Sequence, residues 1–205
     1  MNSATDCRAN EVGVRAKAAA RAAETGFTLF ELLITLAILA VLSSVAMPGF
    51  NRFREKRIAD TTIARVAQAV TAARSSAINH NSLVTLCRSE DAEACGGSWQ
   101  QGILIFTDAN GDRQLDGPDR VLRYLSFPEA QGSLSWRAFG RRQYIQFTNL
   151  GTTRKQNGSF TYCPYNRKLE HARQLILNHS ARARFAQDED GDGIVDTASG
   201  HALPC

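Results

Sequence analysis

The pattern of apolar positions changes twice along the 205-residue chain. From Phe27 to Met47 nearly every position is apolar, and the exceptions are hydroxyl groups and one acid, Glu31. A run of this length can cross a hydrocarbon layer of about 30 Å as a helix. A lone carboxylate is costly in such a span, which indicates a functional group with a partner. The pattern therefore predicts a membrane-spanning or filament-core helix over 27–47.

Beyond Pro48 the apolar residues recur at helical spacing instead of continuously. The predicted stripe comprises Ile63, Val66, Ala67, Val70 and Ala77, with Arg65, Gln68 and Arg74 off it. A proline inside a helix removes a backbone hydrogen bond. We therefore expect one helix over 27–80, bent or broken near Pro48-Gly49, whose amphipathic half over 48–80 packs on a globular head.

From Ser82 onward the chain shows strand and turn signals. Short runs rich in β-branched and aromatic residues alternate with Asn-Gly and Gly-Pro pairs. The runs cover 84–87, 102–107, 120–124, 144–147, 159–163 and 173–177. Six or seven short strands and one long helix predict an α+β fold, with the helix packed on an antiparallel β-sheet head over 81–205.

The start of the apolar run carries a recognisable junction. Residues 26 to 31 read Gly-Phe-Thr-Leu-Phe-Glu, and with the run that follows they resemble the processing site of type IV prepilins and type II secretion pseudopilins. The resemblance implies that prepilin peptidase removes residues 1–26 as a leader by cutting after Gly26. The new amine of Phe27 is then methylated, and Glu31 pairs with such an amine in a neighbouring subunit during assembly.

The same resemblance implies a single-pass protein of the inner membrane, with its C-terminal head in the periplasm before it enters a filament. The alternatives are a plain signal anchor and a cleaved secretory signal. A secretory signal has an apolar core of about 7–15 residues with its cleavage site after it. Here the junction precedes a longer run.

Cysteines add an indication of compartment. Cys7 lies in the predicted leader, which leaves Cys87, Cys95, Cys163 and Cys205. An even number in a small exported domain favours disulfides in an oxidising periplasm. The alternative is a zinc site, which usually needs closely spaced ligands such as Cys-x-x-Cys, and the chain has no such pair. Proximity in sequence favours pairing Cys87 with Cys95 and Cys163 with Cys205.

The head carries a second resemblance. The spacing of Cys87 and Cys95, Trp99, and the runs 102–108 and 157–163 are similar to the GspH/FimT group of minor pilins and pseudopilins. The resemblance implies a structural and priming subunit, with other minor and major pilins or pseudopilins as partners. The cysteine-bracketed loop and the C-terminal cysteine favour a FimT-like pilin of a type IV pilus. The alternative is a GspH-like pseudopilin that acts in protein export and binds no DNA.

DNA is a further predicted partner. FimT-like pilins of naturally competent bacteria resemble this chain at residues 180–184, where the family's DNA-binding pattern is Gly-Arg-x-Arg. Arg182 and Arg184 match this pattern, but Ala181 replaces the glycine. Arg154 and Lys155 are additional candidates for phosphate contacts. The alternative is a solvated strand face, and a net charge of only +4 does not by itself indicate nucleic acid.

An acidic segment near the C-terminus suggests calcium. The carboxylates of Asp188, Asp190, Asp192 and Asp196 occupy positions 1, 3, 5 and 9 of an EF-hand-type loop, and Gly193 occupies position 6. Position 12 is Ser199 instead of a bidentate glutamate. Residues 108–116 repeat the oxygen spacing, with Arg113 in place of the glycine. The alternative is two acidic turns, because Asp, Asn and Gly favour turns.

Catalytic motifs do not stand out. The four histidines have no spacing typical of a metal site, and the chain contains no Gly-x-Ser-x-Gly motif or phosphate-binding loop. The sequence therefore predicts a structural protein and no enzyme.

Overall fold

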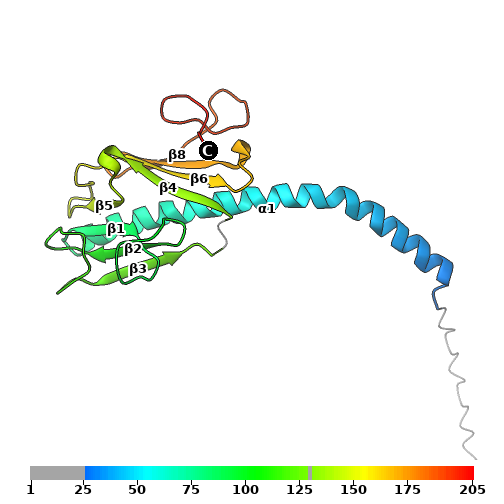
Figure 1. The fold of residues 1–205 in the computed structure, drawn as a ribbon, viewed down its shortest axis with the longest axis horizontal. Coiled ribbons are helices and arrows are strands. Elements are labelled where there is room, and N and C mark those ends of the chain that lie inside the picture. Colours follow the sequence, from blue (N-terminus) through cyan, green and yellow to red (C-terminus); the bar gives the residue numbers. More distant parts are fainter. Residues whose placement is uncertain (1–25, 129–130) are drawn as a thin grey trace, which may run out of the picture. The chain divides into compact units, whose positions relative to one another are not determined.

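The computed structural model describes residues 26–128 and 131–205. One long helix, α1 (Leu29–Asn79), is followed by a head of short strands (Figure 1). The strands are β1 (Val84–Arg88), β2 (Gly102–Thr107), β3 (Val121–Ser126), β4 (Gly132–Ala138), β5 (Tyr144–Phe147), β6 (Gly158–Pro164), β7 (Arg173–Leu177) and β8 (Ala183–Phe185). Two single turns of 3₁₀ helix, η1 (Phe139–Arg141) and η2 (Leu169–His171), precede β5 and β7.

The strands form two antiparallel sheets of four. The first sheet has the order β3-β2-β1-β5, and the second has the order β4-β6-β7-β8. Every pairing within them is antiparallel. The predicted α+β fold with a helix packed on antiparallel sheet is confirmed. The described residues form eight strands where the sequence predicts six or seven, and the division into two sheets was not predicted.

Two strands were missed for different reasons. In β4 the residues alternate between buried and exposed, with Leu134 and Trp136 inside and Ser133 and Ser135 outside. This alternation is a strand signal, but β4 lacks the β-branched residues that mark the other runs. In β8 all three residues are exposed, so the strand exists only because it pairs with β7.

The second half of α1 contributes one wall of the core. Its buried stripe is Ala59, Ile63, Val66, Ala69, Val70, Ala73 and Ala77, each at most 3% exposed. Most of the predicted stripe residues are buried, whereas Ala67 is only partly covered. The stripe packs in one cluster with inward-facing residues of both sheets, including Trp136, Phe147 and Phe160. The alanines have short side chains, which lets the sheet residues approach the helix closely.

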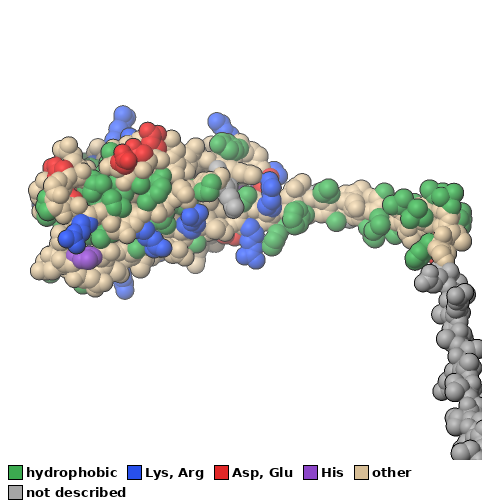
Figure 2. All heavy atoms as spheres, turned by 90° about the horizontal axis from the view of Figure 1, so that it is seen from below, with side chains coloured by type: hydrophobic (Ala, Val, Ile, Leu, Met, Phe, Trp, Pro, Cys, Tyr) green, Lys and Arg blue, Asp and Glu red, His purple; other side chains and the backbone are tan. Residues whose placement is uncertain are grey.

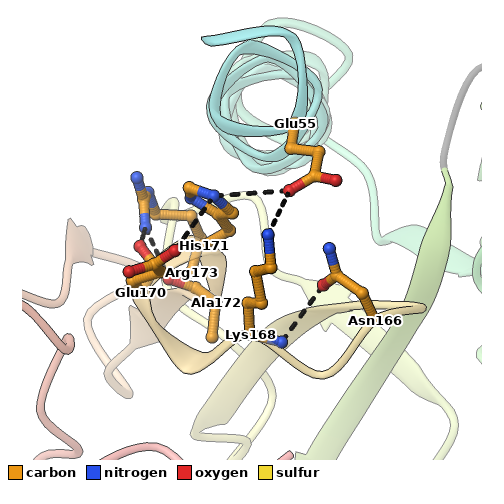
Figure 3. Close-up of polar contacts among 7 residues, drawn as sticks. All are labelled: Glu55, Asn166, Lys168, Glu170, His171, Ala172 and Arg173. Carbon is orange, nitrogen blue, oxygen red and sulfur yellow. Dashed lines mark hydrogen bonds and ion pairs between the residues drawn. The ribbon is translucent and has the colours of Figure 1, made fainter. Parts of the chain in front are cut away.

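Polar contacts fasten α1 to the segment that leads into β7 (Figure 3). The Glu55 carboxylate lies 3.7 Å from Lys168 Nζ and 3.5 Å from His171 Nε2. One turn further along the helix, Arg173 Nε donates to Asp60 Oδ1 at 2.7 Å. Partly exposed ion pairs contribute about 0–1 kcal/mol each. These contacts therefore contribute little to the stability of the head. Their main effect is to fix which part of α1 lies against the segment before β7.

The chain divides into two compact units, Met1–Val45 and Ala46–Cys205. Most of the predicted leader, over 1–26, lies outside the described residues of the first unit. From residue 26 to 44 the described side chains are exposed, and hydrophobic groups cover this part of α1 (Figure 2). Among the described residues no single helix is long and apolar enough to cross a membrane. Helix α1 is bent at a break that includes Pro48. Taken together, its two pieces, Leu29–Ser44 and Gly49–Asn79, are long and apolar enough to cross a membrane.

Two disulfides tie the loop after β1 and the C-terminal residue to the two sheets. Cys87 of β1 is bonded to Cys95, and Cys163 of β6 is bonded to Cys205, with Cα–Cα distances of 5.6 Å in both. This is the pairing that the sequence favours. The second bond holds the C-terminal segment against the second sheet, where Leu203 is buried.

Candidate functional site

The N-terminal motif lies at the start of α1. Gly26 and Phe27 precede the helix, and the Phe27 side chain is 85% exposed. Thr28 Oγ1 accepts a hydrogen bond from the Glu31 backbone N–H at 3.2 Å, so Thr28 caps the helix. Threonine followed three residues later by glutamate is the pattern of a capping box. This signal was visible in the sequence, but the interpretation of Glu31 as an assembly group did not use it.

The arginine pair predicted to contact DNA lies at the edge of the second sheet. Arg182 and Arg184 are both exposed, and with Ile176 and Asn178 they line a hollow of about 330 Å³. Arg184 lies opposite Ile176 in the β7–β8 pairing. The Arg182 backbone N–H donates to Asn178 Oδ1 at 2.9 Å, which closes a turn just before β8.

The turn that the family's glycine would form is also present here, although residue 181 is an alanine. Ala181 has φ of +55°, the left-handed conformation that glycine adopts most readily. Its methyl group is buried, and its carbonyl accepts a hydrogen bond from Arg74 Nη1 of α1 at 3.4 Å. Packing against the helix therefore imposes the conformation that an alanine resists.

The other two cations predicted to contact DNA lie elsewhere. Arg154 and Lys155 line a separate hollow of about 600 Å³ beside β5, together with Arg113 and Arg142. The structure thus separates the four predicted DNA contacts into two pairs in two hollows. Arg113 was noted only as a departure from the calcium pattern, and its place beside Arg154 depends on tertiary structure.

The acidic loop gathers three of its four predicted ligands. Single carboxylate oxygens of Asp188, Asp190 and Asp196 lie within 4.8 Å of one another, whereas Asp192 is not part of this group. The Asp188 oxygens accept the backbone N–H groups of Gly191 and Gly193 at 2.7 and 2.8 Å. Oxygen-only clusters of this kind suit a hard cation such as calcium.

The hydrogen bonds and charges of the loop shift the pKa values of two of its carboxyl groups, in opposite directions. The Gly193 backbone hydrogen bond is the main reason that the pKa of Asp188 lies below its usual value. At Asp190 the hydrogen bond from the Asp192 N–H lowers the pKa. Desolvation and the charges of Asp192 and Asp196 together outweigh it and raise the pKa overall. The loop therefore holds one carboxylate whose charge is stabilised and one whose charge is opposed by its neighbours.

Comparison with known proteins matches two segments of the chain. The family described as type II transport protein GspH matches residues 62–181. The prokaryotic N-terminal methylation motif matches residues 21–47.

Similar proteins come from pili. Two proteins of Pseudomonas aeruginosa, each called fimbrial protein, are 27% identical to this chain over 97 residues. The match covers 47% of this chain and 61% of each relative's length.

Two crystal structures of the type IV minor pilin FimU of Pseudomonas aeruginosa strain PAO1 are similar at 20% and 19% identity, with TM-scores of 0.48 and 0.45. They cover 66% and 62% of this chain and 90% of FimU. The GspH match, over residues 62–181, spans more than half of the 205 residues. The protein belongs to the GspH/type IV minor pilin family.

Proposed function

We propose that the chain is a minor pilin or pseudopilin, a structural and priming subunit of a type IV pilus or a type II secretion pseudopilus. The observation that carries this is the exposed apolar surface of the first half of α1, which lies within the segment that matches the N-terminal methylation motif. Among the described residues of their own unit these side chains have no partner surface, so we expect a membrane or neighbouring subunits to cover them. The fimbrial relatives support a pilus in particular.

In this proposal prepilin peptidase cuts after Gly26, and Phe27 becomes the methylated N-terminus. The head faces the periplasm while the helix is held in the inner membrane. The Glu31 carboxylate then pairs with the Phe27 amine of a neighbouring pilin or pseudopilin. No described residue of the chain itself forms a hydrogen bond or ion pair with that carboxylate.

The test uses Glu31→Leu in cells. The variant should be processed and should accumulate in the membrane, because removing the acid eases residence in lipid. It should nevertheless be missing from sheared filaments, as immunoblotting of the filament fraction would show. Gly26→Leu should instead stay unprocessed. Incorporation of Glu31→Leu at the wild-type level would contradict the assembly role, and a mature N-terminus other than Phe27 would contradict the cleavage site.

DNA binding is a second candidate function, favoured by the two exposed arginines beside β8. Arg182 and Arg184 carry no carboxylate partner among the described residues, so both are available to phosphates. Affinity for duplex DNA should fall steeply with salt, and Arg182→Gln with Arg184→Gln should flatten that slope by about two contacts. If wild-type protein retards no DNA at low salt, the role is the structural one alone.

Calcium binding by the acidic loop is proposed from the convergence of Asp188, Asp190 and Asp196. The ion would relieve the repulsion that raises the pKa of Asp190. Calcium at millimolar concentration should therefore raise the melting temperature by mass action, and Asp190→Asn with Asp196→Asn should abolish the rise. An unchanged melting curve, with no heat in calorimetry, would leave the loop as an acidic turn.

A further inference from the structure

A groove rich in cations lies at the end of the head where α1 terminates. Its volume is about 600 Å³. Its lining contains Arg113, Arg142, Arg154, Lys155, Phe139 and Tyr144, and no carboxylate. We call it the cationic groove. The loop after β2 is fixed near the end of α1, because the Asp108 N–H donates to Leu83 O at 2.9 Å.

The cationic side chains are held in place by aromatic and backbone contacts. The guanidinium of Arg113 lies over the Tyr144 ring at 5.1 Å from its centre, and its Nη1 is 3.3 Å from the Tyr144 hydroxyl. The guanidinium of Arg154 lies against the backbone of Gly111, where a Cβ atom would collide with it. Ordered cations lose less conformational freedom when a ligand binds.

These cations have no counterion of their own. The ion pairs among the described residues involve Lys168, His171 and Arg173, and none involves a cation of the groove. Two of the polar side-chain atoms of the glutamines are occupied, since Gln146 Nε2 donates to Asp108 Oδ2 at 2.9 Å and Gln156 Oε1 accepts the Gln146 N–H at 2.7 Å. The charged groups that the lining offers to a ligand are the four cations.

Two lining residues of the groove and one neighbour of the lining have left-handed backbone. Arg113, Arg141 and Lys155 have φ of +70°, +54° and +58°. Arg113 and Lys155 line the groove, and Arg141 precedes Arg142. Left-handed backbone is uncommon for residues other than glycine. Such strain clusters at functional sites, where the surrounding structure holds it.

We infer that the cationic groove binds an acidic segment of a protein, with carboxylates on the guanidinium groups and an apolar side chain against Phe139. Arginine binds carboxylates in a planar, two-pronged geometry. Arginine and aromatic residues are enriched in protein interfaces. Phe139 is 89% exposed, which leaves its ring open to such a partner.

Nucleic acid fits the groove less well. Single-stranded nucleic acid is bound on rows of exposed aromatic rings. Here Arg113 already covers the Tyr144 ring, which leaves Phe139 as the open ring of the lining.

We assign the segment to the acidic loop of a second copy of this chain, because Asp188, Asp190 and Asp192 are exposed there and complement the four cations in charge. The first probe is a labelled synthetic peptide with the sequence of residues 186–197, compared with the same peptide carrying Asn and Gln in place of its acids. Fluorescence anisotropy with the detergent-solubilised full chain, in the presence of a calcium chelator, should show binding of the acidic peptide only.

The groove variant is Arg142→Gln with Lys155→Gln, because both side chains are exposed and form no recorded side-chain hydrogen bond or ion pair. It should weaken binding by about tenfold or more. The matched control, Arg182→Gln with Arg184→Gln, removes the same charge from β8 and should change binding by less than about twofold. Phe139→Ala should weaken it several-fold at unchanged charge.

Sedimentation then tests the second copy as the occupant. If the wild-type chain forms a concentration-dependent dimer and the groove variant does not, the bound segment is the acidic loop of a second copy. A chain that stays monomeric while it binds the peptide would overturn the second copy as the occupant and would assign another subunit. Equal binding of acidic and neutral peptides, or equal loss in the groove variant and its control, would overturn the inference. So would tighter binding of a thymidine oligonucleotide through the same cations, which would assign nucleic acid instead.

Discussion

The two halves of α1 share one backbone conformation and have opposite surroundings. Along Leu29–Ser44 every side chain is exposed, including Phe30 at 72% and Val41 at 65%. Along Gly49–Asn79 one face is buried, and Val66 and Ala73 are 0% exposed. A helix that is apolar all round needs an apolar environment on every side, whereas a striped helix needs one partner surface. The head supplies that surface to the second half.

This difference shows where the stability of each half originates. The second half is stabilised by its own chain, through the core cluster, the contact of Asp60 with Arg173 and the contacts of Glu55 (the last are drawn in Figure 3). The first half depends on molecules outside the chain. Substitutions in the two halves should therefore have effects on different properties of the protein.

The largest effect is expected from a charge in the buried stripe. Val66→Asp should lower the free energy of unfolding of the head by about 5 kcal/mol or more, because the carboxylate would be buried without a partner. Denaturant titration of the solubilised chain measures this. The matched change Val41→Asp should leave the unfolding midpoint unaltered and lower membrane insertion instead. A similar loss of head stability in both variants would contradict the contrast between the halves.

The next effect concerns the two disulfide bonds that stabilise the head. Cys163→Ser with Cys205→Ser opens a loop with a sequence separation of 42, which should cost about 4 kcal/mol. Cys87→Ser with Cys95→Ser opens a separation of 8 and should cost about 2.5 kcal/mol. Thermal unfolding would rank the two. Membrane residence of the first half should be unchanged, and a reversed ranking would show that loop length does not control the effect.

A smaller effect is expected where α1 contacts the turn before β8. Ala181→Val should cost about 2 kcal/mol, because a buried β-branched side chain fits poorly at φ of +55°. Ala181→Gly should change stability by less than about 0.5 kcal/mol, since relief of strain offsets the lost methyl burial and the freer unfolded chain. Equal effects of the two substitutions in chemical denaturation would mean that the turn is not under strain.

The smallest expected effect is a change in the stability of the head with pH. The pKa of Asp188 is lowered below 3.8, so its stabilising contribution is present above that pH and is lost as pH falls through the folded-state value. The destabilisation by Asp188→Asn should therefore disappear in acid. The pKa of Asp190 is raised, so Asp190→Asn should slightly raise the melting temperature at neutral pH. The opposite sign at either position would contradict the hydrogen-bond pattern of the loop.

Sequence reasoning succeeded where the signal is local. Continuous apolarity over 27–47, the stripe of Ile63, Val66 and Val70, and most strands follow from spacing and residue type. The pairing of cysteines follows from proximity along the chain. It failed at β8, whose exposed residues become a strand only through β7.

The candidate sites divide in the same way. The loop of Asp188, Asp190 and Asp196 is contiguous in sequence, so its convergence follows from local spacing and turn chemistry. The cationic groove combines Arg113, Arg142 and Arg154 from three separate loops around β5. Sequence spacing contains no information on which cations face one another across such a groove.

The sequence by itself determined the helix, the class of fold, the N-terminal motif and the identity of the acidic loop, because hydrogen bonding and side-chain spacing within a segment control these features. Tertiary structure decided how the strands divide into two sheets and forced Ala181 into left-handed backbone. It also placed Arg154 beside Arg113 and away from Arg182. These outcomes depend on how the α1 stripe and the two sheets share one core, and that packing is a property of the whole head.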